Sequence, residues 1–260
     1  MLGNLIYMKG SMLCVTCLWV LNLCLSAADE TGLHHGKTGA GKKVIPYRWV
    51  ETGEGDSPAL ILFLHGMGER GKDNHRQMKH GIPSLLRWLK KENKHCVLVV
   101  PQCPGDATWA STKGSHKDAD RLKLSSKPSY PMALVLSLLD EMLKKHRVNK
   151  SQIYITGLSM GGYGTFDALA RRPDFFAAAI PICGGGDKKT ADKIKHVPMW
   201  VFHGDADSVV PPAMSRAMVK ALENAGGTPK YTEYKGVRHN SWSATYANPE
   251  VWNWLFAQNK

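Results

Sequence analysis

The chain has 260 residues, a formal net charge of +12, and 43% hydrophobic residues. A chain of this length can bury a full hydrophobic core without stabilising cross-links, and α/β chains of this size are routinely single domains. The basic residues are spread along the chain as doublets and no nucleic-acid-binding motif accompanies them, which excludes a nucleic-acid partner at this level.

The first 28 residues have the three-part pattern of a secretory signal peptide. Lys9 supplies the positive charge, residues 12–25 form an apolar run, and residues 26–28 (Ser-Ala-Ala) supply a small-x-small cleavage site. The apolar run holds about 14 residues, whereas a membrane-spanning helix needs roughly 18–20. We therefore expect a cleaved signal, a secreted or periplasmic protein, and no stable membrane insertion after cleavage.

The cysteines argue against both a disulfide framework and a structural metal site. Three of the six lie in the predicted signal peptide, which leaves Cys96, Cys103 and Cys183. An odd number permits one disulfide at most. Cys96 and Cys103 flank one predicted strand, which holds them too far apart to bond. No pair has zinc-finger spacing, so we expect no structural metal.

Beyond the signal peptide, the chain begins with residues 29–43, which are rich in Gly, His, Lys and Thr and lack periodicity. They predict a flexible segment in front of a single domain that spans residues 44–260. Apolar, β-branched and aromatic runs predict the strands, at residues 44–51, 59–64, 96–101, 153–156, 177–182, 199–203 and 230–234. Amphipathic or capped segments predict the helices, at residues 75–91 (interrupted by Pro83), 132–146, 161–171, 212–224 and 249–258.

The alternation of strands and helices predicts an α/β fold. The spacings allow βαβ crossovers, and the continuous apolar run at residues 59–64 is typical of a strand covered on both faces of a parallel sheet. Residues 103–130 break the alternation, being rich in Gly, Asp, Ser, Lys and Pro. We expect them to form a long excursion over the sheet edge, where such a loop can shape a substrate site.

A nucleophile motif, G-x-S-x-G, is formed by Gly-Leu-Ser-Met-Gly at residues 157–161. It follows a predicted strand and precedes a predicted helix, which is the context of a sharp turn that exposes the serine hydroxyl. The positions two residues before and after the serine must be small because strand and helix nearly touch there, and Gly157 and Gly161 meet this demand. We predict that Ser159 is a nucleophile; the alternative is a turn that only connects strand to helix.

A serine nucleophile needs a base, and the base needs an acid that orients it. With such a turn the chain order is serine, acid, histidine. His239 follows the last predicted strand, where a loop can return it to Ser159, and is the predicted base. His203 lies inside an apolar strand and is interpreted as a core or supporting histidine, and His196 as a surface residue.

Two aspartates compete for the role of the acid, since both follow the strand at residues 199–203. Asp205 is close to the strand end and could cap the turn through its own side chain. Asp207 lies further along the loop, where it can project toward His239. We favour Asp207.

Acyl transfer also needs two backbone N–H groups to bind the oxyanion. One is expected from Met160, directly after the serine, and the other from the glycine-rich loop at residues 65–71, at Met67 with Gly68 as the alternative. This chemistry needs no cofactor. Because a histidine base must be neutral, activity is expected to fall below about pH 6–7.

Four further residues are candidates for substrate binding. Gly66 and Gly68 let the backbone approach the substrate, and Gln102 and Trp109 are candidates for lining the cleft. Tyr163 is expected to pack in the core, and Trp242 is expected to pack against the loop that carries His239.

Together these motifs resemble the dienelactone hydrolase-like and phospholipase/carboxylesterase-like branch of the α/β-hydrolases. Many members of this branch are labelled "predicted peptidase", and feruloyl esterase-like proteins are similar to it. The resemblance covers roughly residues 44–258 and is carried by five segments: residues 64–71, residues 100–103 with Trp109, and residues 157–165, 203–211 and 236–242.

The resemblance implies the α/β-hydrolase fold, esterase activity and, in many members, secretion. The match of residues 203–211 to H-G-x-x-D-x-x-V-P supports Asp207 as the acid. Dienelactone hydrolases themselves use a cysteine nucleophile where this chain has Ser159, which favours acyl esters. We therefore expect a small-molecule or polysaccharide-linked substrate with a short-acyl or hydroxycinnamoyl ester. The alternatives are a serine peptidase of the same fold and a non-catalytic carbohydrate- or partner-binding module.

Overall fold

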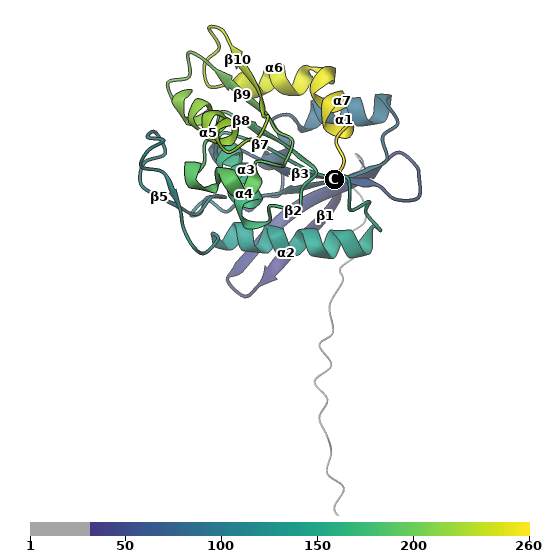
Figure 1. The fold of residues 1–260 in the computed structure, drawn as a ribbon. Helices are drawn as coiled ribbons and strands as arrows, with labels where there is room; N and C mark the ends of the chain where they lie inside the picture. The colour runs from purple at the N-terminus through teal and green to yellow at the C-terminus, as the bar shows by residue number, and fades with distance from the viewer. Residues whose placement is uncertain (1–31) are drawn as a thin grey trace, which may run out of the picture.

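A single large sheet of eight strands forms the centre of the computed structural model, which describes residues 32–260 (Figure 1). In sheet order the strands are β1 (His34–Ala40), β2 (Lys43–Thr52), β4 (Cys96–Pro101), β3 (Ala59–Leu64), β7 (Ile153–Leu158), β8 (Ala178–Ile182), β9 (Trp200–Gly204) and β10 (Lys230–Tyr234). Pairing is antiparallel in β1–β2 and β2–β4 and parallel in the rest. The predicted signal peptide, residues 1–28, lies outside the described residues.

Helices cover both faces of this sheet. On one face lie α2 (Tyr130–Lys145), α3 (Met160–Arg171), α4 (Ala191–Ile194) and α5 (Ala213–Asn224), and on the other α1 (Ile82–Lys91), α6 (Ser241–Ala247) and α7 (Pro249–Phe256) (Figure 1). Short 3₁₀ turns complete the elements: η1 (Met67–Glu69), η2 (Arg76–Met78) and η3 (Lys188–Thr190). This is the predicted α/β architecture, a covered and mainly parallel sheet.

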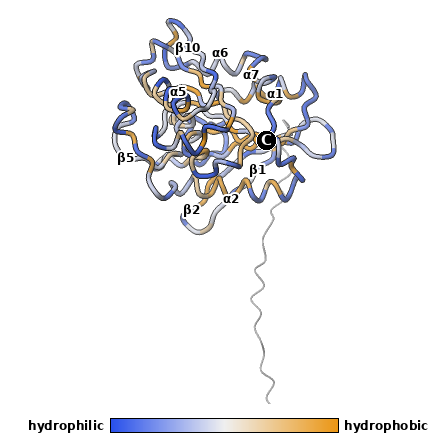
Figure 2. The backbone as a smooth tube through the Cα atoms, viewed as in Figure 1, coloured by the Kyte–Doolittle hydropathy of each residue, from blue (hydrophilic) through white to orange (hydrophobic). Residues whose placement is uncertain are grey.

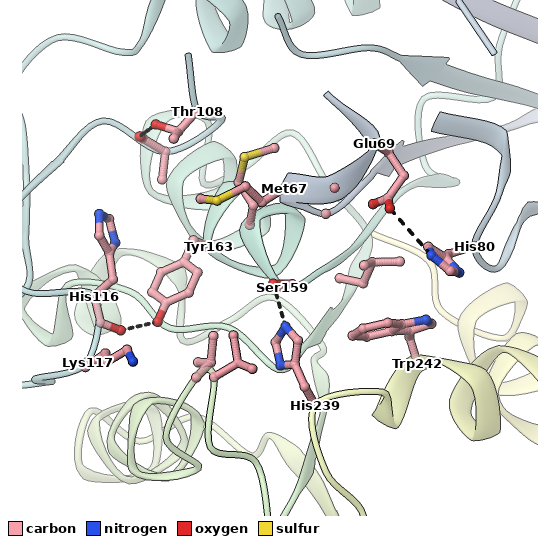
Figure 3. Close-up of a pocket in the computed structure, with 17 residues that line it drawn as sticks. Met67, Glu69, His80, Thr108, His116, Lys117, Ser159, Tyr163, His239 and Trp242 are labelled. Atoms are coloured by element: carbon pink, nitrogen blue, oxygen red, sulfur yellow. Dashed lines mark hydrogen bonds and ion pairs between the residues drawn. The ribbon is translucent and has the colours of Figure 1, made fainter. Parts of the chain in front are cut away.

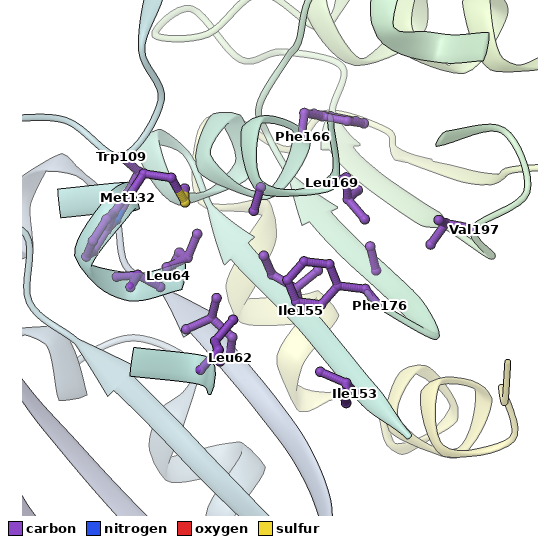
Figure 4. Packing of buried hydrophobic residues seen from close by; sticks show 14 of the residues in the cluster. Leu62, Leu64, Trp109, Met132, Ile153, Ile155, Phe166, Leu169, Phe176 and Val197 are labelled. Atoms are coloured by element: carbon purple, nitrogen blue, oxygen red, sulfur yellow. The ribbon is translucent and has the colours of Figure 1, made fainter. Parts of the chain in front are cut away.

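Strand β3 shows how the sequence builds two cores. All six of its residues are buried, and successive side chains point to opposite faces. Leu62 and Leu64 join the core under α2 and α3 (Figure 4), whereas Ile61 and Phe63 join the core under α1 and α7. Hydrophobic residues accordingly gather at the centre of the fold, with hydrophilic residues along its outer turns (Figure 2). No helix in the described part of the chain is long and apolar enough to cross a membrane.

The expectation of a flexible segment at residues 29–43 is wrong for residues 34–40, which form β1. This strand pairs with β2 through a tight hairpin in which Gly41 has φ = 58°. It lies at the edge of the sheet, where few of its side chains are buried, and so it has no hydrophobic alternation to reveal it. The ring of His34 stacks on Trp49 of β2 with centroids 4.1 Å apart.

Three other segments depart from the predicted elements. The predicted helix at residues 75–91 is divided into η2 and α1, because Gly81 at the start of α1 has φ = 78°. The excursion after residue 103 contains a small ribbon of β5 (Thr112–Lys113) and β6 (Lys123–Leu124) and ends where α2 begins. Helix α6, directly after the predicted base, was not expected. The three cysteines in the described residues are buried free thiols.

Candidate active site

Ser159 occupies a sharp turn between β7 and α3. Its φ and ψ are 54° and −117°, a strained conformation for a residue with a side chain, and it is the N-cap of α3. The turn is tight enough that a Cβ atom at Gly157 would overlap the carbonyl of Gly161, and one at Gly161 would overlap the carbonyl of Leu64. The predicted demand for small residues on either side of Ser159 is therefore present in the structure.

A continuous chain of hydrogen bonds runs from Ser159 to His239 and Asp207. His239 Nε2 lies 2.9 Å from Ser159 Oγ, and His239 Nδ1 lies 2.7 Å from Asp207 Oδ2. The Asp207 side chain is fully buried, and its second oxygen accepts hydrogen bonds from the backbone amides of Val209 and Val210, at 2.8 and 3.0 Å. The structure thus brings together the three residues predicted as nucleophile, base and acid, in the geometry of a serine-hydrolase triad.

Asp205 has a different place. Its Oδ1 accepts a hydrogen bond from the backbone amide of Gly236 at 2.6 Å, and its own amide donates to the carbonyl of Tyr234. It therefore ties the end of β9 to the loop that carries His239, without contacting the histidine ring. Of the two competing aspartates, Asp207 is the one that reaches His239.

A second histidine contacts Asp207 from inside the core. His203 of β9 is fully buried, with Nε2 3.2 Å from Asp207 Oδ2 and 3.0 Å from the carbonyl oxygen of Val210. Its Nδ1 lies 2.7 Å from Ser215 Oγ in α5. Burial lowers the pKa of His203, which favours the neutral ring, and the two acceptor oxygens facing Nε2 place its proton there. The expectation of a supporting histidine agrees with this position.

The predicted oxyanion donors lie at two helix starts beside Ser159. Met67 is the first residue of η1 and Met160 the first of α3, so their amides have no acceptor within their own helices. Both residues, and the alternative donor Gly68, line the same pocket as Ser159. The structure therefore supplies free N–H groups of the kind that an oxyanion needs, and both Met67 and Gly68 remain available as the second donor.

His65 anchors the loop that carries Met67. Its Nε2 accepts a hydrogen bond from the amide of Cys103 at 2.9 Å, and its carbonyl accepts one from Trp109 Nε1 at 3.0 Å. His65 Nδ1 lies 2.6 Å from the carbonyl oxygen of Gly66. Burial lowers the pKa of His65 to about 4, so the ring is neutral at pH 7 and Nε2 remains free to accept.

A cavity of about 480 Å³ opens beside Ser159 and His239 (Figure 3). Most of its lining is apolar and includes Met67, Ala110, Leu158, Met160, Tyr163, Val209, Val210 and Trp242. Side chains on the loops, Met67 and Val209, are 54% and 52% exposed, so the rim is hydrophobic and open to ligands. Such a cavity suits a small apolar group held next to a reactive hydroxyl.

Two of the four predicted substrate-binding residues line this cavity, and two do not. Gly66 and Gly68 lie in its wall. The prediction is wrong for Gln102 and Trp109, which are fully buried beneath the loop of Met67. Gln102 Nε2 donates to the carbonyl of Glu69 at 3.1 Å, and Trp109 Nε1 donates to the loop as described above. Both side chains hydrogen-bond to this loop from its buried side, because the loop folds back over the end of β4.

Several residues of the cavity are not predicted from sequence. Tyr163 and Trp242 line the cavity rather than only packing behind it, and Trp242 also meets the ring of His239 edge-on at 5.2 Å. The remaining polar side chains of the wall come from loops and turns: Glu69, His80, Thr108, His116 and Lys117. Glu69 belongs to the glycine-rich loop at residues 65–71, but the others stand in segments without any local motif.

One group of possible metal ligands is found in the described residues, and it overlaps the candidate triad. Ligand atoms of Cys183, Asp207 and His239 lie within 4.8 Å of one another. Burial raises the pKa of Cys183 to about 12, so the thiol is protonated at neutral pH. Since Asp207 and His239 are already bonded to each other, these side chains suit a triad better than a metal site.

Known proteins resemble this chain in both sequence and structure. Residues 46–248 match the Phospholipase/Carboxylesterase family. The crystal structure of a thermostable esterase is 36% identical, with a TM-score of 0.78, over 88% of this chain and 64% of that chain. A ferulic acid esterase shares the fold at 16% identity, with a TM-score of 0.63, over 86% of this chain and 97% of that chain.

A curated relative is the bifunctional acetylxylan esterase/xylanase of Neocallimastix patriciarum, which is 27% identical over 66% of this chain. The present chain spans only 22% of that protein, as it spans 64% of the thermostable esterase. The family match, by contrast, extends from β2 to the end of α6, across the sheet and all three residues of the candidate triad. This chain therefore belongs to the phospholipase/carboxylesterase family and has the α/β-hydrolase fold.

Proposed function

We propose that this protein is a serine carboxylesterase that forms an acyl-enzyme on Ser159. The observation that carries the proposal is the hydrogen-bond chain from Ser159 through His239 to Asp207, with Ser159 and His239 opening into an apolar cavity. Nucleophile, base and orienting acid thus stand in bonding distance of one another, and the reacting hydroxyl is accessible to a ligand.

In the proposed mechanism, His239 Nε2 takes the proton of Ser159 as Oγ attacks the ester carbonyl. The amides of Met160 and Met67 stabilise the oxyanion. Protonated His239 then gives its proton to the departing alcohol, and a water molecule activated by the same ring cleaves the acyl-enzyme. Asp207 stays ionised throughout and stabilises the imidazolium.

The substrates proposed for this site are short-acyl or hydroxycinnamoyl esters, either free or linked to a polysaccharide. The cavity volume of about 480 Å³ and its apolar wall suit such an acyl group. The names of two similar proteins, an acetylxylan esterase/xylanase and a ferulic acid esterase, support the same substrate class.

The test is hydrolysis of 4-nitrophenyl esters, from acetate to octanoate plus ferulate, by the wild type, by Ser159→Ala and by Ser57→Ala. Ser57 is an exposed serine between β2 and β3 and serves as the matched control. We expect the Ser159→Ala variant to lose about 10⁴-fold or more in kcat, and a fluorophosphonate probe to label the wild type and the control only. A wild type that neither hydrolyses any ester nor reacts with the probe would refute the proposal.

We further propose that the protein is exported and that residues 1–28 are removed. The support is the sequence pattern of a positive residue, an apolar run and a Ser-Ala-Ala site. Expression of the full chain in a secreting host, followed by N-terminal sequencing of the protein in the medium or periplasm, tests this. A mature chain that begins at Asp29 is expected, and an intact N-terminus on the cellular protein would contradict it.

A further inference from the structure

The cavity has two chemically different sides, one on either side of Ser159 and His239 (Figure 3). Tyr163, His116 and Lys117 lie on one side, and Glu69, His80 and Trp242 lie on the other. We propose that Glu69, His80 and Trp242 form a subsite for the alcohol part of the ester, and that this alcohol is a sugar or another neutral polyol. This inference rests on the proposed esterase function.

The carboxylate of Glu69 is the unusual feature of this subsite. Its side chain is only 10% exposed, and in the described residues its one partner is His80, whose Nε2 lies 3.5 Å from Oε1. An ionised carboxylate offers about four acceptor positions, and a buried charge without enough partners is unfavourable. Glu69 therefore keeps acceptor capacity that hydroxyl groups of a ligand in the cavity can use.

The position of this acid strengthens the inference. Glu69 Oε2 lies 3.0 Å from where a Cβ atom at Gly66 would stand, so the negative charge is held beside the loop of the predicted oxyanion donor. A negative charge near a developing oxyanion opposes catalysis. The chemical step therefore does not account for an acid at this position, whereas binding of a ligand does.

Trp242 supplies the second element of the subsite. Its ring lines the cavity, lies 5.6 Å from the ring of His80, and meets His239 edge-on. A sugar ring has apolar C–H faces and hydroxyl groups around its rim. An aromatic face next to an acceptor-rich carboxylate matches both features at once.

The contact between Trp242 and His239 assigns this side to the alcohol. In ester cleavage the protonated base gives its proton to the departing alcohol oxygen, so the alcohol part must lie next to the base. Trp242 is the aromatic residue that packs directly on His239. The acyl part is then left to the apolar wall around Tyr163 and Met160.

Charge favours a neutral polyol over an ammonium alcohol. The chain carries a formal net charge of +12, and His80 stands directly beside Glu69. A cationic alcohol would be opposed by the protein's overall field and would compete with His80 for the carboxylate. Hydroxyl groups meet neither obstacle.

The test compares three acetyl esters that differ in the alcohol: a mono-O-acetyl methyl xyloside, cyclohexyl acetate and acetylcholine. The wild type is expected to show a kcat/KM about tenfold or more higher on the xyloside than on cyclohexyl acetate, as hydrogen bonds to a charged group imply. Glu69→Gln should lower the ratio of kcat/KM on the xyloside to kcat/KM on cyclohexyl acetate by about tenfold, whichever way the loss of the charge shifts the chemical step that both esters share. Trp242→Leu should lower kcat/KM on the xyloside by about tenfold. Glu54→Gln, in the exposed turn between β2 and β3, is the matched control and should change neither.

Three outcomes would overturn the subsite. They are equal losses on xyloside and cyclohexyl acetate in Glu69→Gln, which would make Glu69 a structural part of the loop; no preference of the wild type for the xyloside; and a preference for acetylcholine that depends on Glu69. Labelling of Ser159 by a fluorophosphonate and turnover of 4-nitrophenyl acetate are measured in parallel. If both fail, the esterase proposal falls; if both succeed while the xyloside preference is absent, only the subsite falls.

Discussion

Two histidines from different regions of the molecule contact the same oxygen of Asp207. His239 stands on the loop after β10, with Nδ1 2.7 Å from Oδ2 and a side chain that is 20% exposed. His203 stands inside β9, with Nε2 3.2 Å from the same oxygen and a side chain that is fully buried. The rings differ in what faces the opposite nitrogen, which is Ser159 Oγ in the cavity for His239 and Ser215 Oγ in the core for His203.

Contact with an acid therefore does not by itself identify a catalytic base. A ring nitrogen can exchange protons with a substrate only where it reaches the reacting group. The loop gives His239 that access, whereas the strand gives His203 a fixed place from which it can orient Asp207. We therefore propose that the loop histidine transfers the proton and that the strand histidine supports the acid.

The largest effect should come from removing the loop histidine. His239→Gln is expected to lower kcat on 4-nitrophenyl acetate by about 10⁴-fold or more, because no other ring of residues 32–260 bonds to Ser159 Oγ and His203 is held in the core. The measurement is steady-state hydrolysis, with circular dichroism and a melting curve to show that the variant is folded. Activity within about tenfold of the wild type would refute the division of roles.

Lowering the pH should reduce the stability of the fold through its buried histidines. The pKa of His65 is lowered by burial from 6.5 to about 4, and burial also lowers the pKa of His203. Between these two pKa values the unfolded chain binds more protons than the folded chain. The free energy of unfolding therefore falls as the pH drops from 6.5 toward 4. For His65 the full loss is about 3 kcal/mol, and His203 adds to it in the same direction.

Urea unfolding between about pH 7.5 and pH 5 measures the larger part of this loss, since the full loss is reached only below the pKa of the folded state. Arg216 lowers the pKa of Glu233 to about 2, so that carboxylate gives up its contribution only below pH 4.5, outside the chosen range. The His65→Gln variant is the comparison, because its amide oxygen can still accept from Cys103 while it cannot titrate. An equally steep pH dependence in this variant would rule out His65 as a cause.

Removing the strand histidine should have a smaller effect on catalysis. His203→Leu deletes the donor to Asp207 and is expected to lower kcat by about ten- to a hundredfold with little change in KM, since a hydrogen bond to a charged group is worth about 1.5–3 kcal/mol. His203→Gln keeps a donor near the position of Nε2 and should recover most of the loss. Rates are expressed per fluorophosphonate-labelled site, so that unfolded protein does not count. A wild-type kcat per site in His203→Leu would show that Asp207 needs no such support.

Chain order and position in the sheet decide which parts of the candidate site could be predicted from sequence. Ser159 stands in a motif whose backbone geometry is local, and the end of a strand fixes where Asp207 and His239 can lie. Such residues are predictable because their position follows from chain order and from the edge of a parallel sheet. The two aspartates could be ranked, but only the fold shows that Asp205 bonds to Gly236.

Residues whose position depends on tertiary packing were predicted less well. His80 and Lys117 reach the cavity from segments without a motif, and Gln102 was assigned to the cavity although the loop above covers it. The edge strand β1 was missed because burial there is too slight to leave a pattern. Local backbone geometry produces a pattern in the sequence, whereas the burial of one loop beneath another does not.

The smallest effect should come from Asp205, the aspartate that competed with Asp207 in the sequence. Asp205→Asn keeps an oxygen that can accept from the amide of Gly236, so the turn that carries His239 should persist. We expect kcat to change by less than about threefold and the free energy of unfolding by about 1 kcal/mol or less. Hydrolysis of 4-nitrophenyl acetate and urea unfolding measure the two quantities.

Asp207→Asn is the matched change, and it should lower kcat by about 10³–10⁴-fold, because an amide can hold the imidazole in the wrong tautomer and cannot stabilise an imidazolium. The two variants alter one oxygen each, two residues apart, so overall charge and loop composition are the same in both. A large loss in Asp205→Asn with a small one in Asp207→Asn would reverse the assignment. In that case Asp205 would be the acid, and the contact between His203 and Asp207 would not contribute to catalysis.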